Sequence, residues 1–430
     1  MKISVVGTGY VGLVTATGLA SKGHNVVCID IDQDKVDMVN RAEPPFYEDN
    51  LAEALDSCVK QSAKLRASSD YKELLESDAT FICVNTSPNS GENADLSYIG
   101  KSAKRIGKTL GEKAGYHVVI TKSSVVPGTT EELIIPLLEQ YSGKSVGTDF
   151  GVAVNPEFLQ EGKALQCFLN TDRIIVGEYD KRSGDTIEEI YKAWTSPMLR
   201  TELKTAEMIK FASNAFLATK ITFINEIGNL CKRLGIDIYE VADGMGLDPR
   251  IGRSFLNAGI GFGGSCLPKD LEALLHKYEK TGEESALLSA VYQVNMNQPL
   301  RIVEAVIGRL GELKNKQIAV LGLAFKPDTD DTRHAPAVRV IQELLGQGAR
   351  VKAYDPKAMS NMQGNGFQAL EYCASARDAV KGCDCVLILT EWDEFKDERI
   401  YSDKVVIDGR RVLDPERAKG VCQHYEGVCW

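Results

Sequence analysis

Short apolar runs alternate with longer amphipathic stretches over roughly the first 200 residues. Each run is rich in β-branched residues and is followed by a turn signal, which is typical of buried strands. The runs predict strands at 3–6, 26–30, 81–84, 118–121, 152–154 and 174–176. Strands that alternate with helices indicate an α/β fold with a parallel, doubly wound sheet covered on both faces.

The middle of the chain has a different pattern. Residues 202–234 contain no proline and no glycine before Gly228, and their apolar side chains lie on almost every side of a helix. Such a long central helix is buried, either in a core or in a subunit interface. Further helices are predicted at 271–278 and 286–308, and strands return at 318–321, 351–354, 386–389 and 405–407. We expect three domains at 1–200, 201–310 and 311–430, the last being a second, smaller α/β domain.

The composition is that of an ordinary globular protein, with 43% hydrophobic and 26% charged residues and a net charge of -10. An acidic surface repels nucleic acid and anionic membranes, so a phosphate-bearing ligand needs a local cationic pocket. No apolar run approaches the ~20 residues that span a bilayer. The glycines in MKISVVGTGYVGLV are unlike a signal peptide. We therefore expect a cytoplasmic protein with no membrane or nucleic-acid partner.

The eleven cysteines form no CxxC pair, and the five histidines form no HExxH motif. This pattern predicts no metal site. In the cytoplasm disulfides are rare, so most of these cysteines are expected to be small buried apolar residues.

The first glycine cluster has the context of a dinucleotide-binding motif. Gly7, Gly9 and Gly12 have G-x-G-x-x-G spacing, follow the strand at 3–6 and open a helix. The next strand ends in Asp30, 18 residues after Gly12, where a carboxylate binds ribose hydroxyls and disfavours a 2′-phosphate. A tight turn without a ligand is the alternative. The acidic residue favours NAD binding, in a Rossmann-like domain.

The second glycine cluster, GFGGSCLPKD at 261–270, leads into a predicted helix through Cys266. A helix N-terminus stabilises a thiolate, so Cys266 is a candidate nucleophile. Asp270 lies four residues further on and shares its face if the turn is helical. The alternative is a buried cysteine in a glycine-rich turn, and for the other ten cysteines we accept it.

Two further groups of polar residues lie in apolar surroundings. Lys210 and Asn214 are four residues apart on the long helix. In one interpretation the two side chains stabilise an oxyanion, and in the other the lysine extends along the helix to solvent. Spacing alone does not favour either interpretation. In NPEFLQEGKAL, Asn155 and Pro156 fit a helix N-terminus that would place Glu157 and Glu161 on one face. A glutamate favoured by the helix dipole is the simpler explanation there.

Several of these strings together resemble the UDP-glucose/GDP-mannose dehydrogenase family over essentially the whole chain. The matching strings are GTGYVG, VNTSPNSG, TKSSVVPGTT, NPEFLQEG, EMIKFASNAF, DPRIG, GFGGSCLPKD, LGLAFKPDTDDTR and DGRRVLD. DPRIG and DGRRVLD are most similar to the UDP-glucose branch, whereas TDFGVAVNPEFL and the final GVCW resemble the GDP-mannose branch. Dehydrogenases of UDP-N-acetylhexosamines are a more distant alternative.

The resemblance implies an N-terminal Rossmann-like NAD domain, a central helix that forms a homodimer, and a smaller C-terminal domain for the nucleotide sugar. It implies a four-electron oxidation of UDP-glucose to UDP-glucuronate at one site. Cys266 would carry a thiohemiacetal and then a thioester, and Lys210 with Asn214 would stabilise the oxyanion. Asp270 would position water, Glu157 would be the base for hydrolysis, and Glu161 would contact the cofactor.

The resemblance also assigns ligand contacts. Ser124 stands where the family usually has threonine, and its hydroxyl preserves a catalytic and cofactor role. The other cofactor positions are Gly7, Gly9, Tyr10, Val11, Gly12, Asp30, Lys35, Thr86, Glu161 and Arg333. The substrate positions are Glu157, Phe158, Leu159, Lys210, Asn214, Arg250, Phe255, Asn257, Gly261, Phe262, Gly263, Lys326 and Arg410. Arg250 would reach across the dimer. Spacing alone does not say which of Lys326, Arg333 and Arg410 contacts NAD.

A sensor that binds NAD or a nucleotide sugar without catalysis is a competing hypothesis, because a fold alone permits it. A sensor does not need the nucleophile Cys266 or the set formed by Lys210, Asn214 and Asp270. The sequence therefore favours an enzyme.

Overall fold

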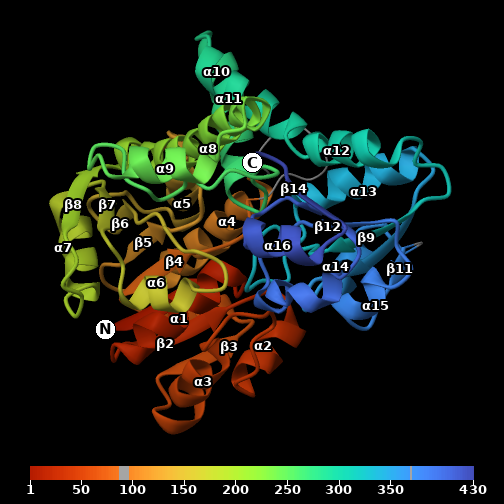
Figure 1. Ribbon diagram of the computed structural model, residues 1–430. Helices are drawn as coiled ribbons and strands as arrows, with labels where there is room; N and C mark the ends of the chain where they lie inside the picture. The colour runs from red at the N-terminus through yellow and green to blue at the C-terminus, as the bar shows by residue number, and fades with distance from the viewer. Residues whose placement is uncertain (87–95, 369) are drawn as a thin grey trace. The chain divides into compact units, whose positions relative to one another are not determined.

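Two sheets organise the chain, one in each of two units, Met1–Ser213 and Asn214–Trp430 (Figure 1). The computed structural model describes residues 1–86, 96–368 and 370–430. The string VNTSPNSG lies partly outside the described residues. The division into three domains predicted from the sequence stays a prediction, whereas the predicted fold class is confirmed.

The first unit contains an eight-stranded sheet with the order β3-β2-β1-β4-β5-β6-β7-β8. Its strands are β1 (Lys2–Val6), β2 (Asn25–Ile29), β3 (Leu65–Ser68), β4 (Ala79–Ile82), β5 (Val118–Thr121), β6 (Gly151–Val154), β7 (Ile174–Glu178) and β8 (Met198–Glu202). Neighbouring strands are parallel except β6 and β7, which pair antiparallel. The six predicted strands are therefore present, and β3 and β8, which contain polar residues, are the two that the apolar pattern missed.

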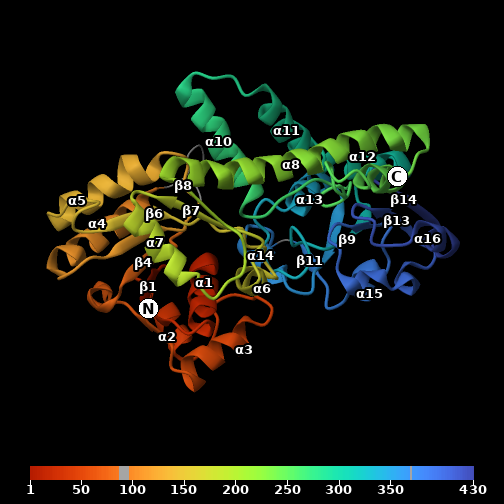
Figure 2. The ribbon, with the colours of Figure 1, turned by 90° about the vertical axis from the view of Figure 1, so that its left-hand side faces the viewer.

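Helices cover both faces of this sheet because its central strands are apolar on both sides. Val5 and Phe81 belong to one apolar cluster, whereas their neighbours Val6 and Ile82 belong to another. Figure 2 shows α4 and α5 together on one side of the strands and α1 on the other. The helices are α1 (Tyr10–Ser21), α2 (Gln33–Asn40), α3 (Leu51–Asp56), α4 (Ser97–Glu112), α5 (Ile135–Ser142), α6 (Ala164–Leu169) and α7 (Lys181–Ile190), with short turns η1 (Ser57–Gln61), η2 (Tyr71–Glu76) and η3 (Thr130–Ile134).

The second unit contains a six-stranded parallel sheet with the order β11-β10-β9-β12-β13-β14. Its strands are β9 (Gln317–Leu321), β10 (Arg350–Tyr354), β11 (Glu371–Tyr372), β12 (Cys385–Ile388), β13 (Val405–Asp408) and β14 (His424–Gly427). Its helices are α9 (Ile238–Gly246), α10 (Leu267–Thr281), α11 (Ala286–Asn297), α12 (Leu300–Leu310), α13 (Pro336–Gly346), α14 (Met359–Gly364), α15 (Ala376–Val380) and α16 (Pro415–Val421), with turns η4 (Asp393–Lys396) and η5 (Glu398–Tyr401). The four residues of β12 and of β13 are all buried, so both faces of the sheet are covered.

The long central helix, α8 (Leu203–Leu234), confirms the prediction for 202–234. Burial of this helix in the core of the single chain is wrong, because Phe216, Phe223 and Leu230 remain exposed. Its burial in a subunit interface, the other alternative, stays a prediction. The helix predicted at 286–308 is also wrong as one element. It divides into α11 and α12 on either side of Gln298 and Pro299, since proline lacks the N–H that a continuous helix needs. None of the described helices is both long and apolar enough to cross a membrane.

Both sheets reverse their strand order beside their first strand, where ligands bind in open α/β sheets. Gly7 after β1 and Gly322 after β9 have positive φ angles of 98° and 96°. Their N–H groups donate to the last residues of β2 and β10, at 2.8 and 2.9 Å. Asp355 after β10 is fully buried and accepts from the N–H groups of Leu323 and Ala324 and from the Trp392 indole. The equivalent carboxylate of the first unit, Asp30, is only half-buried.

Buried His117 links β4 to the start of β5 and gives the first prediction. Its Nδ1 donates to the Ser77 carbonyl at 2.9 Å, so its Nε2 accepts from the Thr80 hydroxyl at 2.8 Å. Burial, with the nearby Lys113 charge, lowers the pKa of His117 from 6.5 to about 3. Below pH 6.5 the unfolded chain therefore binds a proton that the folded chain does not, and the free energy of unfolding falls by about 1.4 kcal/mol per pH unit from this group.

We expect His117→Gln to lose stability less steeply than the wild type between about pH 6 and pH 4. The measurement is the urea-unfolding free energy of both proteins as a function of pH, in which the shared carboxylates cancel. Parallel curves for the two proteins would contradict this explanation.

Candidate active site

The first glycine cluster forms an open helix N-terminus at the edge where β1 ends. A Cβ on Gly12 would lie 1.8 Å from the Gly7 carbonyl oxygen, so close packing explains that glycine. Gly9 has an ordinary φ of -72°, and a Cβ there would meet no atom within 4 Å. The chain itself gives no reason for Gly9 to be glycine, whereas close approach of a pyrophosphate does. No described side chain caps α1, which begins at Tyr10 and Val11, and the N–H groups at such a helix N-terminus are suited to an anionic ligand.

Asp30 lies at the same edge and is already bound to the glycine-rich loop. Its Oδ2 accepts from the N–H and hydroxyl of Thr8, both at 2.6 Å, and its Oδ1 accepts from the Asp32 N–H at 3.1 Å. Lys35 on α2 is half exposed and forms an ion pair of 3.7 Å with Asp32. Thr86 and Ser124 follow β4 and β5. Because parallel strands end at a common edge, these cofactor candidates gather there.

A buried carboxylate that the sequence did not reveal connects this edge to the segment with Glu161. Glu48 is 5% exposed and accepts from the N–H groups of Gly162 and Ala164 at 2.7 and 2.6 Å. The Tyr10 hydroxyl also donates to Glu48. Glu161 itself is half-buried beside this network.

Lys210 and Glu157 form a buried ion pair in the first unit. The Lys210 Nζ lies 2.8 Å from Glu157 Oε1, and both side chains are about 5% exposed or less. The Leu159 N–H donates to Glu157 Oε2 at 2.7 Å, and the Phe158 ring lies 5.5 Å from the Lys210 Nζ. Burial alone raises the pKa of Glu157, but the charge and hydrogen bond of Lys210 outweigh it and lower that pKa. Lys210 therefore does not extend to solvent, and Glu157 is a carboxylate at neutral pH.

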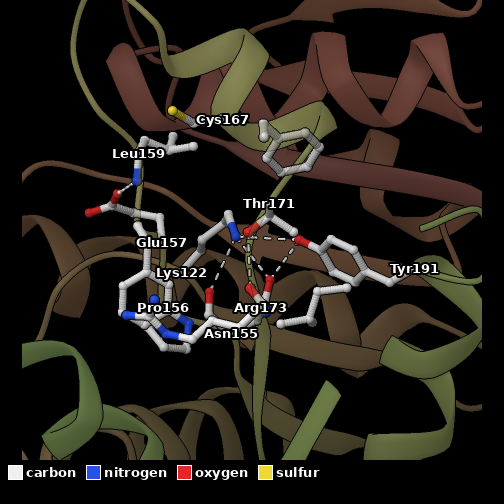
Figure 3. Close-up of a pocket in the computed structure, with 12 residues that line it drawn as sticks. Lys122, Asn155, Pro156, Glu157, Leu159, Cys167, Thr171, Arg173 and Tyr191 are labelled. Atoms are coloured by element: carbon white, nitrogen blue, oxygen red, sulfur yellow. Dashed lines mark hydrogen bonds between the residues drawn. The ribbon is translucent and has the colours of Figure 1, made fainter. Parts of the chain in front are cut away.

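The helix predicted from NPEFLQEG is wrong. Residues 155–160 form neither helix nor strand, and α6 begins only at Ala164. Asn155 does not cap a helix, because its Oδ1 accepts from Lys122 Nζ at 2.9 Å and from the Tyr191 hydroxyl at 2.7 Å (Figure 3). The dipole explanation for Glu157 therefore fails.

Cys266, Asp270 and Asn214 come together in the second unit. Cys266 is the N-cap residue of α10 and is half-buried, and its carbonyl accepts from the Asp270 N–H at 2.9 Å. The Asn214 amide donates to Asp270 Oδ2 at 2.6 Å, and both side chains are buried. The predicted helical relation between Cys266 and Asp270 is thus present.

Three buried amide side chains fix the loop of the second glycine cluster, and the sequence did not reveal them. Asn225 accepts from the Gly259 N–H at 2.8 Å, and Gln298 donates to the Gly259 carbonyl at 2.7 Å. Asn295 binds both the N–H and the carbonyl of Phe262, at 2.9 and 3.1 Å. Gly261 has a φ of 94°, which only glycine adopts readily.

Other loop residues predicted to bind substrate lie close by in the sequence, with different surroundings. Phe255 is 40% exposed with a φ of 65°, and Asn257 accepts from the Arg253 guanidinium at 2.8 Å. A Cβ on Gly263 would lie 2.2 Å from the His334 carbonyl oxygen, so this glycine allows the loop to approach the segment before α13.

The candidate cations of the second unit follow its strands. Arg410 donates to the Leu389 carbonyl at 3.2 Å, and its backbone N–H donates to buried Asp408 at 2.9 Å. Arg333 is half exposed and pairs with Asp331 at 2.7 Å. Lys326 Nζ lies 5.8 Å from the centroid of the Phe325 ring. These three cations lie in loops that follow β9 and β13, at the edge suited to a ligand.

Arg250 lies apart from these cations. Its side chain is 87% exposed and pairs with Asp248 at 2.7 Å. It is therefore available to a molecule outside the chain.

The chain matches three parts of the UDP-glucose/GDP-mannose dehydrogenase family. The NAD binding domain matches residues 1–195, the central domain matches 204–297 and the UDP binding domain matches 319–415. Together these matches cover most of the chain.

Individual relatives agree with the family match. The UDP-glucose 6-dehydrogenase of Haloferax volcanii is 43% identical, over 96% of this chain and 97% of the relative. The solved UDP-glucose dehydrogenase of Pyrobaculum islandicum has a TM-score of 0.95 and 41% identity, over 100% of this chain and 98% of that one. A GDP-mannose dehydrogenase of Pseudomonas aeruginosa has a TM-score of 0.58 and 33% identity, over 100% of each chain.

The buried pair gives a prediction that does not depend on catalysis. We expect Lys210→Met to lower the free energy of unfolding by about 3 kcal/mol, because the Glu157 carboxylate is left buried without its partner. Adding Glu157→Gln should recover most of the loss, since the double variant carries no buried charge at this pair. Urea unfolding of the two variants and the wild type measures this, and equal stability of single and double variants would contradict it.

Proposed function

Because the chain belongs to the UDP-glucose/GDP-mannose dehydrogenase family, whose nucleotide-sugar dehydrogenases use NAD, we propose that it oxidises UDP-glucose to UDP-glucuronate. The observation that carries the proposal is the placement of Cys266 at the N-terminus of α10, one turn before Asp270, which binds Asn214. A thiol at this position is a suitable nucleophile for an aldehyde carbon.

The proposed chemistry retains the reactive aldehyde on the enzyme. The primary alcohol is first oxidised, and the Cys266 sulfur then adds to the aldehyde carbon to form a thiohemiacetal. Loss of a hydride from that carbon leaves a thioester. Water then attacks the thioester, which releases the carboxylate and returns the thiol. NAD, when bound, would supply the hydride acceptor, and the two oxidations together would consume two NAD molecules.

The candidate catalytic side chains each have a role in these reaction steps. The Lys210 ammonium and the Asn214 amide would stabilise the oxyanion that forms when sulfur or water adds to the carbon. Glu157 would accept the proton of the attacking water, and its lowered pKa keeps the group unprotonated at neutral pH. Asp270 and the Ser124 hydroxyl would position that water.

The remaining candidate residues would hold the two ligands. Asp30 and the N-terminus of α1 would bind NAD, and Asp30 would disfavour a 2′-phosphate. Arg410, Lys326 and the loop at 257–263 would bind the nucleotide diphosphate on an otherwise acidic protein.

UDP-glucose is favoured over GDP-mannose because UDP-glucose dehydrogenases in the comparison reach 41–43% identity and the GDP-mannose dehydrogenase reaches 33%. Initial rates with UDP-glucose, GDP-mannose and UDP-N-acetylglucosamine in the presence of NAD test it.

We further propose that the enzyme is a homodimer formed through α8. Phe216, Phe223 and Leu230 are 65%, 47% and 54% exposed and lie seven residues apart, so they form one apolar stripe. A second copy of the same helix offers a matching stripe, and exposed Arg250 would then be available to the partner's substrate.

We expect Cys266→Ala to reduce formation of the uronate by at least about 10³-fold, because the covalent intermediate is lost. NAD and UDP-glucose should still bind. Cys266→Ser can form an oxygen ester, which hydrolyses more slowly than a thioester, so an adduct should accumulate. Steady-state NADH formation and intact-protein mass measure both effects.

Cys383→Ser is the matched control, because its buried Sγ bonds only to the Ala379 carbonyl on α15 among the described contacts. It should change stability more than turnover. Near-normal turnover in Cys266→Ala would reject the thioester route.

We expect the wild type to have at least twice the mass of the 47.0 kDa chain in light scattering. Phe223→Glu should shift it towards the monomer, because a charge in the apolar stripe opposes its burial. Leu287→Glu is the control, since this exposed leucine lies on α11 and not on the stripe. A monomeric wild type with full activity would contradict the proposed dimer.

A further inference from the structure

Lys122 is a buried lysine to which the proposed chemistry gives no role. It follows β5 directly and is 3% exposed. Its Nζ lies 5.6–6.0 Å from the ring centroids of Phe81, Phe168 and Tyr191. Burial lowers the pKa of Lys122 to about 8. An ammonium in such surroundings is costly unless its contacts serve a purpose.

Lys122 binds one residue in particular. Its Nζ donates to Asn155 Oδ1 at 2.9 Å, to the Asn155 carbonyl at 3.4 Å and to the Tyr191 hydroxyl at 3.4 Å (Figure 3). Among the ion pairs of the described residues none involves Lys122. Its partners are therefore neutral oxygens and aromatic rings.

These contacts anchor the segment that carries Glu157. Residues 155–160 belong to no helix or strand. The Asn155 N–H donates to the Thr121 carbonyl and its Nδ2 donates to the Ile175 carbonyl, both at 2.9 Å. Its Oδ1 accepts from the Tyr191 hydroxyl at 2.7 Å. Lys122 completes this set at the Asn155 carbonyl, two residues before Glu157.

Lys122 also acts on Glu157 through its charge. Burial raises the pKa of Glu157, and Lys210 together with the Leu159 N–H and Lys122 lowers it. Lys122 and Glu157 line the same small cavity, and because both side chains are buried their electrostatic interaction is stronger than at the surface (Figure 3).

We propose that Lys122 is a positioning residue that fixes the segment at 155–159 and so aims the Glu157 carboxylate for hydrolysis of the thioester. The inference rests on the proposed function, in which Glu157 activates water. A purely structural lysine is the alternative. An apolar side chain would fill the aromatic surroundings at lower desolvation cost, so stability alone does not account for an ammonium there.

The test is Lys122→Met, which keeps the length of the side chain and removes the charge and the hydrogen bonds. We expect it to fold with an unfolding midpoint close to that of the wild type, because methionine packs well against aromatic rings. The kcat should fall about 10–100-fold, because the Glu157 carboxylate would be displaced and a small displacement of a catalytic group lowers the rate by about this factor. The KM values for NAD and UDP-glucose should change little, and intact-protein mass should show an adduct on Cys266, because hydrolysis becomes the slow step.

Two further variants sharpen the result. Tyr191→Phe removes one hydroxyl from Asn155 and keeps the Lys122 charge, so it should lower kcat in the same way but less. Lys113→Met is the matched control, because Lys113 is a half-buried lysine that binds the Leu74 and Leu75 carbonyls instead, and its kcat should equal that of the wild type.

Wild-type kcat in Lys122→Met, or a lower kcat without an adduct, would overturn the inference while the proposed function stands. If Lys122→Met does not fold, an unchanged kcat in Tyr191→Phe would overturn it as well. A wild type that forms no NADH with UDP-glucose would overturn the proposed function and this inference together.

Discussion

The buried pair of Lys210 and Glu157 brings opposite charges together where each side chain is 5% exposed or less. Removing either partner would leave an uncompensated buried charge, so each depends on the other. The pair also depends on the surrounding chain. α8 presents Lys210, and the irregular segment after β6 presents Glu157. Asn155, bound by Lys122 and Tyr191, gives that segment the fixed geometry that helical hydrogen bonds would otherwise supply.

The same principle recurs wherever a loop approaches a ligand-binding edge. Glu48 fixes the segment near Glu161, and Asn225, Asn295 and Gln298 fix the loop before Cys266. Each of these side chains is buried and binds backbone groups. Loops held in this way cost little reorganisation during a reaction, which is the condition for strong stabilisation of charge in a transition state.

The apolar pattern predicted the central strands well, because strands buried on both faces are continuous apolar runs. β5 was predicted to the residue, whereas β11 (Glu371–Tyr372) and β14 (His424–Gly427) contain polar residues and were missed. The cofactor motif could be predicted because all its parts lie within the first 30 residues. The loop after β9 in the second unit differs from this motif. Leu323 and Ala324 follow Gly322, whereas Thr8 and Gly9 follow Gly7 in the first unit. Asp355, which corresponds to Asp30, is fully buried.

Residues whose function depends on distant partners could not be predicted from spacing. Asn-Pro-Glu has the local pattern of a helix start, but the Asn155 side chain binds Lys122 and Tyr191, 33 and 36 residues away, and does not cap a helix. Glu48 binds Gly162 across 114 residues. The spacing of Lys210 did not show whether its side chain is buried or exposed. The long-range contact with Glu157 shows that it is buried.

The central claim is that both oxidations occur at one site through a thioester on Cys266. The most direct test is the stoichiometry of the complete reaction, measured as NADH by absorbance and as uronate by chromatography from the same sample. We expect two NADH and one UDP-glucuronate for each UDP-glucose consumed, with no free aldehyde. One NADH per UDP-glucose, with aldehyde released into solution, would contradict it.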